Sequence, residues 1–95
     1  MFEEVEAAIK AHPDVYDCVV AGRPSDRWGN EVVAIVQFAE GKTATDAELI
    51  DACRPHIAQY KIPKAFVHTD KVVRSPAGKA DYRWAKAMAA QAVEG

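Results

Sequence analysis

A run of five apolar residues near the middle of the chain, Val32 to Val36, constrains the fold more than any other feature. Side chains of a strand alternate between its two faces, so a strand that is apolar at every position needs a cover on both faces. Residues 31–38 are therefore predicted to form a central strand with other elements packed on both sides. The chain has 95 residues, which is enough for a single small domain.

Two further strands are predicted beside this one. Residues 15–21 are apolar and rich in β-branched side chains, which favours a strand. Residues 22–30 contain Gly, Pro, Ser, Asp and Asn, so they are predicted to form a loop, with the strands on either side of it antiparallel. A short third strand is predicted over residues 65–68.

Three helices are predicted from apolar residues that recur every three or four positions. Pro13 ends the first helix, because its ring has no N–H and clashes with the preceding turn. Thr45 and Glu48 have the spacing of a capping box at the start of the second helix, and Asp81 is placed to cap the third. The expected buried stripes are Phe2, Val5, Ile9 and His12, then Leu49, Ile50, Cys53 and Ile57, and then Tyr82, Ala85, Met88, Ala89 and Ala92.

The order helix, strand, strand, helix, strand, helix predicts an α+β fold, a small mixed sheet of about three strands with helices packed on it. We expect residues 1–95 to form one domain. The helical pattern begins at Phe2 with no cap or linker before it. We therefore expect the chain to be part of a longer protein.

Charge and cysteine content exclude several classes of function. A formal net charge of −2 does not indicate attraction of the whole domain to nucleic acid or to an anionic membrane. No apolar run approaches the ~20 residues of a membrane helix. Cys18 and Cys53 lack C-x-x-C spacing, so two buried thiols in a reducing cytoplasm are expected. The three histidines show no metal-ligand spacing, and no metal site is expected.

Three segments have the residue types of a binding or catalytic surface. Residues 74–79 combine Pro and Gly with Lys79, which predicts a tight turn with a cation at its tip. Residues 59–64 place Tyr60 beside Lys61 and near Lys64, so a ring that can stack on a purine lies near ammonium groups that can pair with phosphates. Residues 22–30 contain Trp28 among charged residues. From the residues alone, solvated lysines, a Tyr60 packed on the core edge and a Trp28 folded onto the sheet remain alternatives.

Together these segments resemble the C-terminal domain of the adenylate-forming family, which comprises acyl-CoA and aryl-CoA synthetases, peptide-synthetase adenylation domains and luciferases. The resemblance covers nearly the whole chain, with 19 residues from Tyr60 to Lys79. Val73, Asn30, Ala80 and Tyr82 depart from the residues that are frequent in the family. The similar segments are Glu4-Val5-Glu6, His12-Pro13-Asp14-Val15, Gly22-x-Pro24-x-Asp26-x-x-Gly29, Tyr60-Lys61-Ile62-Pro63-Lys64 and Ser75-Pro76-Ala77-Gly78-Lys79.

The resemblance implies a ligase that works in two steps. ATP and a carboxylic acid give an acyl-adenylate and pyrophosphate, and the CoA thiol then displaces AMP. The small domain is a lid that changes pose between the steps. Lys79 is implied as the adenylation lysine, Tyr60 and Lys64 as contacts to the CoA nucleotide, and Trp28 and Gly29 as part of the loop that faces CoA.

The resemblance also implies partners for this chain. The main partner is a large N-terminal domain that holds ATP and acid, with Mg²⁺ expected in the full enzyme and not bound by this domain. The isolated chain is expected to be inactive. Within the family, the chain looks most like a bacterial fatty-acyl-CoA ligase. The alternatives are the lid of a peptide-synthetase adenylation domain that loads a carrier protein, and a non-catalytic α+β binding module.

Overall fold

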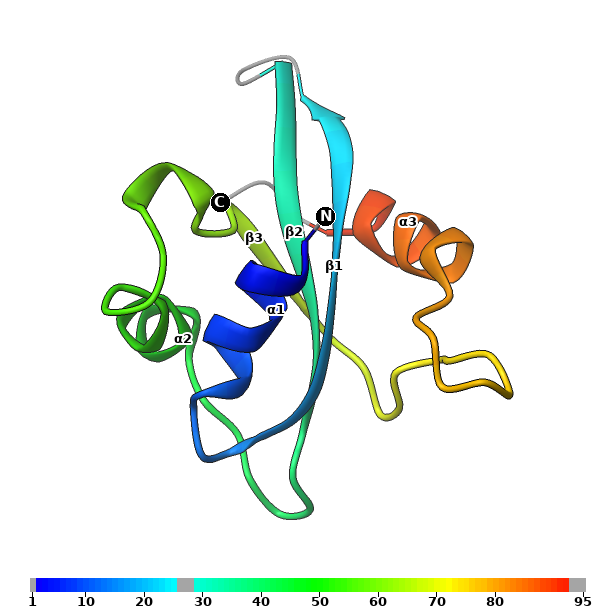
Figure 1. The fold of residues 1–95 in the computed structure, drawn as a ribbon, viewed down its shortest axis with the longest axis horizontal. Coiled ribbons are helices and arrows are strands. Elements are labelled where there is room, and N and C mark those ends of the chain that lie inside the picture. Colours follow the sequence, from blue (N-terminus) through cyan, green and yellow to red (C-terminus); the bar gives the residue numbers. More distant parts are fainter. Residues whose placement is uncertain (1, 26–28, 93–95) are drawn as a thin grey trace.

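The chain folds as a three-stranded sheet between helices, and the computed structural model describes residues 2–25 and 29–92 (Figure 1). The predicted α+β fold and its order of elements are confirmed, with one additional short 3₁₀ turn, η1. The elements are α1 (Glu3–Lys10), β1 (Val15–Ser25), β2 (Gly29–Phe38), α2 (Asp46–Cys53), η1 (Gln59–Lys61), β3 (Ala65–His68) and α3 (Tyr82–Ala90).

β2 is the central strand of the described sheet, whose order is β1-β2-β3. It pairs with β1 antiparallel and with β3 parallel, so the sheet is mixed as predicted. The parallel pair needs a long connection, which α2 and η1 provide. The prediction that residues 31–38 form a central strand is therefore confirmed.

Both faces of the sheet are packed, and the alternation along β1 and β2 divides their side chains between two apolar clusters. Cys18, Val20, Ala34 and Val36 pack with residues of α1 and α2. The side chains between them in sequence pack with α3 on the opposite face. Figure 1 shows this layering, with α1 and α2 on one side of the sheet and α3 on the other. The residues of the second cluster are Val19, Ala21, Val33, Ile35, Ala65, Val72, Ala85 and Ala89.

Local hydrogen bonds account for where the last two helices begin. The Thr45 hydroxyl accepts from the Glu48 backbone N–H, and the Glu48 carboxylate accepts from the Thr45 N–H, which is the predicted capping box. The Asp81 carboxylate accepts from the Trp84 N–H at the start of α3. Both sequence predictions of a cap are confirmed.

A buried carboxylate protects the free edge of β1. Glu6 of α1 is 8% exposed and accepts a hydrogen bond from the Val20 backbone N–H at 2.9 Å. The Tyr82 hydroxyl, at the start of α3, donates to the same carboxylate oxygen at 3.3 Å. Glu6 thus satisfies an edge-strand donor and links α1 with α3. Burial and the neighbouring Glu6 raise the pKa of Tyr82.

The loop predicted over residues 22–30 is too long. β1 continues to Ser25 and β2 begins at Gly29, with Arg23 opposite Glu31 and Pro24 opposite Asn30. Arg23 and Glu31 form a cross-strand ion pair that is almost fully buried, and Arg23 also donates to the Ala89 carbonyl at the end of α3 at 2.7 Å. Pro24 is tolerated because β1 is an edge strand.

The observed helices also end before the last residues of the predicted buried stripes. α1 ends at Lys10, so His12 lies in the turn that follows. α2 ends at Cys53, before Pro55, and Ile57 is buried in a turn rather than on the helix. Ala92 lies beyond the end of α3.

The two cysteines are free and buried, as the sequence predicted. Both have an exposed fraction of 0% and belong to the cluster between the sheet and α1 and α2. Burial raises the pKa of the Cys18 thiol well above its usual range, so Cys18 is a packing residue at neutral pH.

We predict that Glu31→Ala lowers the free energy of unfolding by about 3–5 kcal/mol, because it leaves the buried Arg23 guanidinium without its counter-charge. Asp51→Ala is the matched control. It breaks the exposed Asp51–Arg54 pair, whose side chains are 71% and 59% exposed, and it should cost under ~1 kcal/mol. Urea unfolding of the two variants measures the difference, and equal losses would contradict the role of the Arg23–Glu31 pair.

Candidate functional site

Lys79 lies on a short hairpin between β3 and α3, and we call residues 74–80 the lysine loop. Arg74 and Ala80 form an antiparallel bridge at its base. The Ser75 N–H donates to the Lys79 carbonyl at 2.8 Å, and the Gly78 N–H donates to the Ser75 carbonyl at 2.8 Å. Gly78 has a φ of +83°, a left-handed conformation that glycine adopts without strain. The predicted tight turn is confirmed.

The lysine loop presents its cation outward. The Lys79 side chain is exposed, and the Lys79 backbone N–H is held by the Ser75 hydroxyl at 3.3 Å. Within residues 2–25 and 29–92, the Lys79 amine has no hydrogen bond or ion pair. In Figure 1 the loop, drawn in yellow and orange, projects from the side of the sheet that α3 covers. The backbone is therefore ordered while the ammonium group remains available to a partner.

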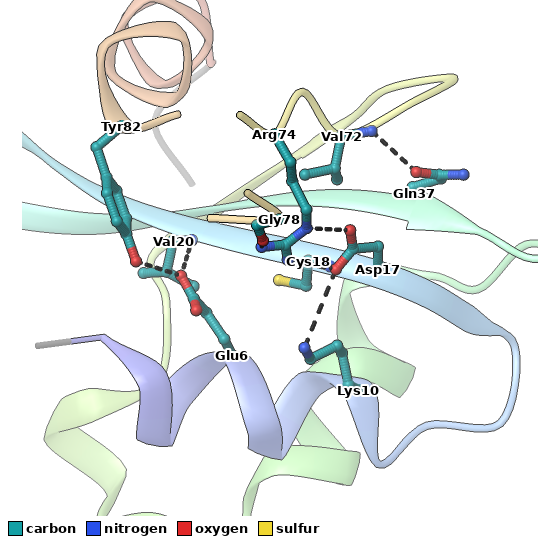
Figure 2. A network of polar contacts seen from close by, with 10 residues as sticks. All are labelled: Glu6, Lys10, Asp17, Cys18, Val20, Gln37, Val72, Arg74, Gly78 and Tyr82. Atoms are coloured by element: carbon teal, nitrogen blue, oxygen red, sulfur yellow. Dashed lines mark hydrogen bonds and ion pairs between the residues drawn. The ribbon is translucent and has the colours of Figure 1, made fainter. Parts of the chain in front are cut away.

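Two side chains from the sheet hold the segment that leads into the loop (Figure 2). Asp17 of β1 accepts two hydrogen bonds from the Arg74 guanidinium, from Nε at 2.8 Å and from Nη2 at 2.7 Å. Gln37 of β2 accepts from the Val72 backbone N–H at 2.9 Å. Hydrogen bonds from Arg74 lower the pKa of Asp17, although partial burial opposes this.

A second set of predicted site residues surrounds η1 and the start of β3. Tyr60 is 78% exposed, so its ring does not pack on the core edge. The neighbouring Lys61 amine lies 5.9 Å from the ring centroid and forms an ion pair of 2.7 Å with Glu4 of α1. Lys64 is exposed, and its backbone N–H donates to the Val32 carbonyl of β2 at 2.8 Å.

Gly29 lies at the start of β2, three residues before Val32. It has a φ of +78°, and a Cβ there would have no atom within 4 Å, so its backbone is open to solvent. Trp28, which the sequence analysis places beside it in the CoA-facing loop, lies outside the described residues. Gly29 and Lys64 therefore belong to the same end of the sheet, where β2 and β3 begin.

The structure separates Lys79 from this second set. Asp17, which anchors the lysine loop, is opposite Gln37 near the end of β2, whereas Lys64 contacts Val32 near its beginning. Five residues of strand at about 3.3 Å each separate Val32 from Gln37 by roughly 17 Å. In Figure 1, η1 lies on the α2 side and the lysine loop on the α3 side. The predicted residues thus form two surfaces rather than one pocket.

Comparison with known proteins identifies the family to which the chain belongs. Residues 4–79 match the model of the AMP-binding enzyme C-terminal domain, which covers the motifs from Glu4 through Lys79. The chain belongs to this family. The sequence-based resemblance to adenylate-forming enzymes is therefore confirmed.

Relatives within the family include several mycobacterial ligases. The chain is 55% identical over 87 residues to the medium-chain acyl-CoA ligase Mig of Mycobacterium avium, covering 92% of this chain and 16% of that protein. It is 54% identical over 84 residues to a Mycobacterium tuberculosis medium/long-chain-fatty-acid–CoA/3-oxocholest-4-en-26-oate–CoA ligase, covering 88% of this chain and 15% of that protein. The chain thus spans less than a fifth of the length of these relatives.

Solved structures of the family share the fold. The o-succinylbenzoate CoA synthetase (MenE) of Bacillus subtilis, in complex with its acyl-adenylate intermediate OSB-AMP, superimposes with a TM-score of 0.80 at 30% identity. The match covers 98% of this chain and 18% of that one. This chain therefore has the architecture of the C-terminal portion of an adenylate-forming enzyme.

Two long-range contacts of this domain were not identified from sequence. Asp17 and Arg74 are 57 positions apart, and Gln37 and Val72 are 35 apart, so no local spacing signals either contact. The only available signal was the position of Arg74 beside the lysine motif. Such pairs become visible only once β1 and the loop are placed in space.

No group of three or more His, Cys, Asp and Glu side chains among the described residues is arranged to hold a metal ion. No helix in the described ranges has both the length and the apolar composition that crossing a membrane requires.

The lowered pKa of Asp17 predicts a specific pH dependence of stability. A carboxyl whose folded pKa is depressed stabilises the fold at neutral pH, and the contribution is lost as pH falls below about 4 through the folded pKa. The difference in free energy of unfolding between wild type and Asp17→Asn should therefore be largest near pH 7 and shrink towards pH 3. Urea unfolding across this range measures it, with Asp51→Asn as the exposed control. A difference independent of pH would contradict the charge-based role of Asp17.

Proposed function

We propose that this chain is the C-terminal domain of an ATP-dependent fatty-acid–CoA ligase. Mycobacterial relatives of this chain are named as acyl-CoA ligases, and we extend that activity to the longer protein of which this chain is a part. The large remainder of such an enzyme binds ATP and the acid, and this domain completes the reaction centre. We expect the enzyme to act in the cytoplasm on medium-chain or longer acids, with Mg²⁺ held outside this chain.

The observation that carries the proposal is the distance between two sets of residues along β2. Lys79 is anchored near one end of this strand, and Tyr60, Lys64 and Gly29 belong to the other end. A rigid domain turns surfaces that face different ways towards one partner in different poses. A domain that rotates can present the lysine loop for adenylation and the other surface for thioester formation. The two surfaces therefore fit a reaction with two successive half-reactions.

Lys79 supplies the positive charge of the first half-reaction. A carboxylate oxygen attacks the α-phosphorus of ATP, and the bond to pyrophosphate breaks. Two anions approach each other in this step, and negative charge spreads over the transition state. An ammonium group on an ordered loop screens that repulsion and holds the attacking oxygen in line. Lysine suits the task because its charge is compact and its stem is thin.

Tyr60, Lys64 and Gly29 contribute to the second half-reaction, in which the CoA thiol attacks the acyl carbonyl and AMP leaves. The exposed Tyr60 ring offers a face for the adenine of CoA, and the Lys64 ammonium group pairs with a phosphate. Gly29 lets the CoA chain approach the backbone at the start of β2. Trp28, which lies outside the described residues, is the remaining residue that the family resemblance assigns to this half-reaction.

We predict that Lys79→Ala in the full-length enzyme slows acyl-adenylate formation by ~10²-fold or more, which is the effect of losing one preorganised transition-state donor. Thioester formation from supplied acyl-adenylate should be retained. Pyrophosphate release measures the first half-reaction, and acyl-CoA formation from acyl-adenylate measures the second. The control Lys42→Ala removes an exposed lysine from another turn and should change neither rate. Equal loss of both half-reactions in Lys79→Ala would show that Lys79 is structural.

Tyr60→Ala should raise the KM for CoA by about tenfold, because base stacking on an aromatic ring contributes ~1–3 kcal/mol. Adenylation should be unaffected. Tyr60→Phe keeps the ring and should retain the wild-type KM, while Tyr16→Ala removes a tyrosine that is 70% exposed elsewhere on the domain. Steady-state kinetics with varied CoA distinguish these variants. An unchanged KM for CoA in Tyr60→Ala would remove Tyr60 from the CoA surface.

A further inference from the structure

The Arg74 guanidinium makes contacts to two different parts of the domain with all three of its nitrogens (Figure 2). Nε and Nη2 donate to the two oxygens of Asp17, at 2.8 Å and 2.7 Å. Nη1 donates to the Gly78 carbonyl at 3.2 Å. Gly78 immediately precedes Lys79, so one planar group connects β1 to the backbone next to the lysine. We call the Asp17–Arg74 pair, with its contact to Gly78, the loop clamp.

Other features of the fold orient Asp17 for its hydrogen bonds with Arg74. The β1–β2 register shifts between Val15 and Asp17, an irregularity of the kind that re-aims side chains at strand ends. The Cys18 backbone N–H donates to Asp17 Oδ1 at 2.8 Å, and the Lys10 amine of α1 lies 4.0 Å from the same oxygen. Asp17 therefore has orienting contacts that are independent of Arg74.

Partial burial makes the loop clamp more rigid than a solvated surface pair. The side chains of Asp17 and Arg74 are 17% and 30% exposed, whereas the exposed Asp51–Arg54 pair is solvated on both sides. A bidentate arginine–carboxylate pair also fixes relative orientation, because two parallel hydrogen bonds prevent rotation. The clamp thus sets the angle of the loop to the sheet as well as its distance.

The loop has few other polar connections to the body of the domain. Among the described residues, the hydrogen bonds of residues 75–79 are internal to the loop or come from Arg74. The internal bonds determine the shape of the turn, but they do not determine where the turn points. The loop clamp does so, together with the hydrogen bond from the Val72 N–H to Gln37 just before the loop.

We infer that Asp17 and Arg74 are positioning residues for adenylation, because their contacts hold the lysine loop at the angle from which Lys79 reaches the reaction centre. The catalytic part of this inference rests on the proposed function. The Arg74 charge is neutralised by Asp17, so Lys79 is the cation that the loop presents. Small displacements of a catalytic group are costly, since ~1 Å can reduce a rate by ~10²-fold.

The test uses Asp17→Asn in the full-length enzyme, because asparagine keeps the shape of the side chain and removes its charge and one of its acceptor oxygens. We expect the kcat of acyl-adenylate formation to fall by ~10-fold or more, with thioester formation from supplied acyl-adenylate unchanged. Asp17→Glu restores a bidentate acceptor and should recover part of the lost rate. Asp51→Asn is the control and should match wild type in both half-reactions.

Amide hydrogen exchange on the same variants reports on the loop independently of activity. In Asp17→Asn the amides of Ser75, Gly78 and Lys79 should exchange about tenfold faster than in wild type, while β2 amides keep their protection. Unchanged loop exchange, unchanged adenylation, or equal loss of both half-reactions would overturn the inference. A failure of the proposed function appears differently, as adenylation that survives Lys79→Ala while the exchange result for Asp17→Asn stands.

Discussion

The burial of β2 on both faces is the constraint on which the rest of the structure depends. The side chains of residues 33–36 have an exposed fraction of 0%, so α1 and α2 must cover one face of the strand and α3 the other. Once these layers are in place, the connections between elements emerge at the two ends of β2. Gly29 and the start of β3 lie at one end, and the lysine loop is anchored at the other. The packing of one strand thereby separates the two surfaces that we assign to the two half-reactions.

The parts of the fold that depend on local patterns were predictable from the sequence. The uninterrupted apolar run identified the central strand, and the Thr45–Glu48 spacing identified the start of α2. The bounds of elements were predicted wrongly where contacts between residues far apart in the sequence determine them. Glycine and proline in residues 22–30 indicate a loop, but the buried pair between Arg23 and Glu31 and the contact of Arg23 with the end of α3 extend the hairpin. Ile57 is apolar with helical spacing from Cys53, but the helix ends first.

The candidate site was predictable in part. The turn chemistry around Gly78 indicated an exposed lysine, and Lys79 is exposed. Tyr60 is exposed rather than packed on the core edge, although composition alone favoured packing. The anchoring of the lysine loop by Asp17 and Gln37 was not predictable, because each contact joins residues far apart in sequence. The roles of Lys79, Tyr60, Lys64 and Gly29 remain predictions, as does that of Trp28, which lies outside the described residues.

The central claim is that opposite ends of one small sheet meet the reaction centre at different times. Hydrogen exchange of the full-length enzyme in two ligand states tests this claim most directly. With ATP and a carboxylic acid analogue, we expect amides of residues 75–79 to become protected and those of residues 60–64 to stay exchangeable. With CoA and an unreactive acyl-adenylate analogue, the pattern should reverse. Simultaneous protection of both segments in either state would contradict the account, because both surfaces would then be covered in one pose.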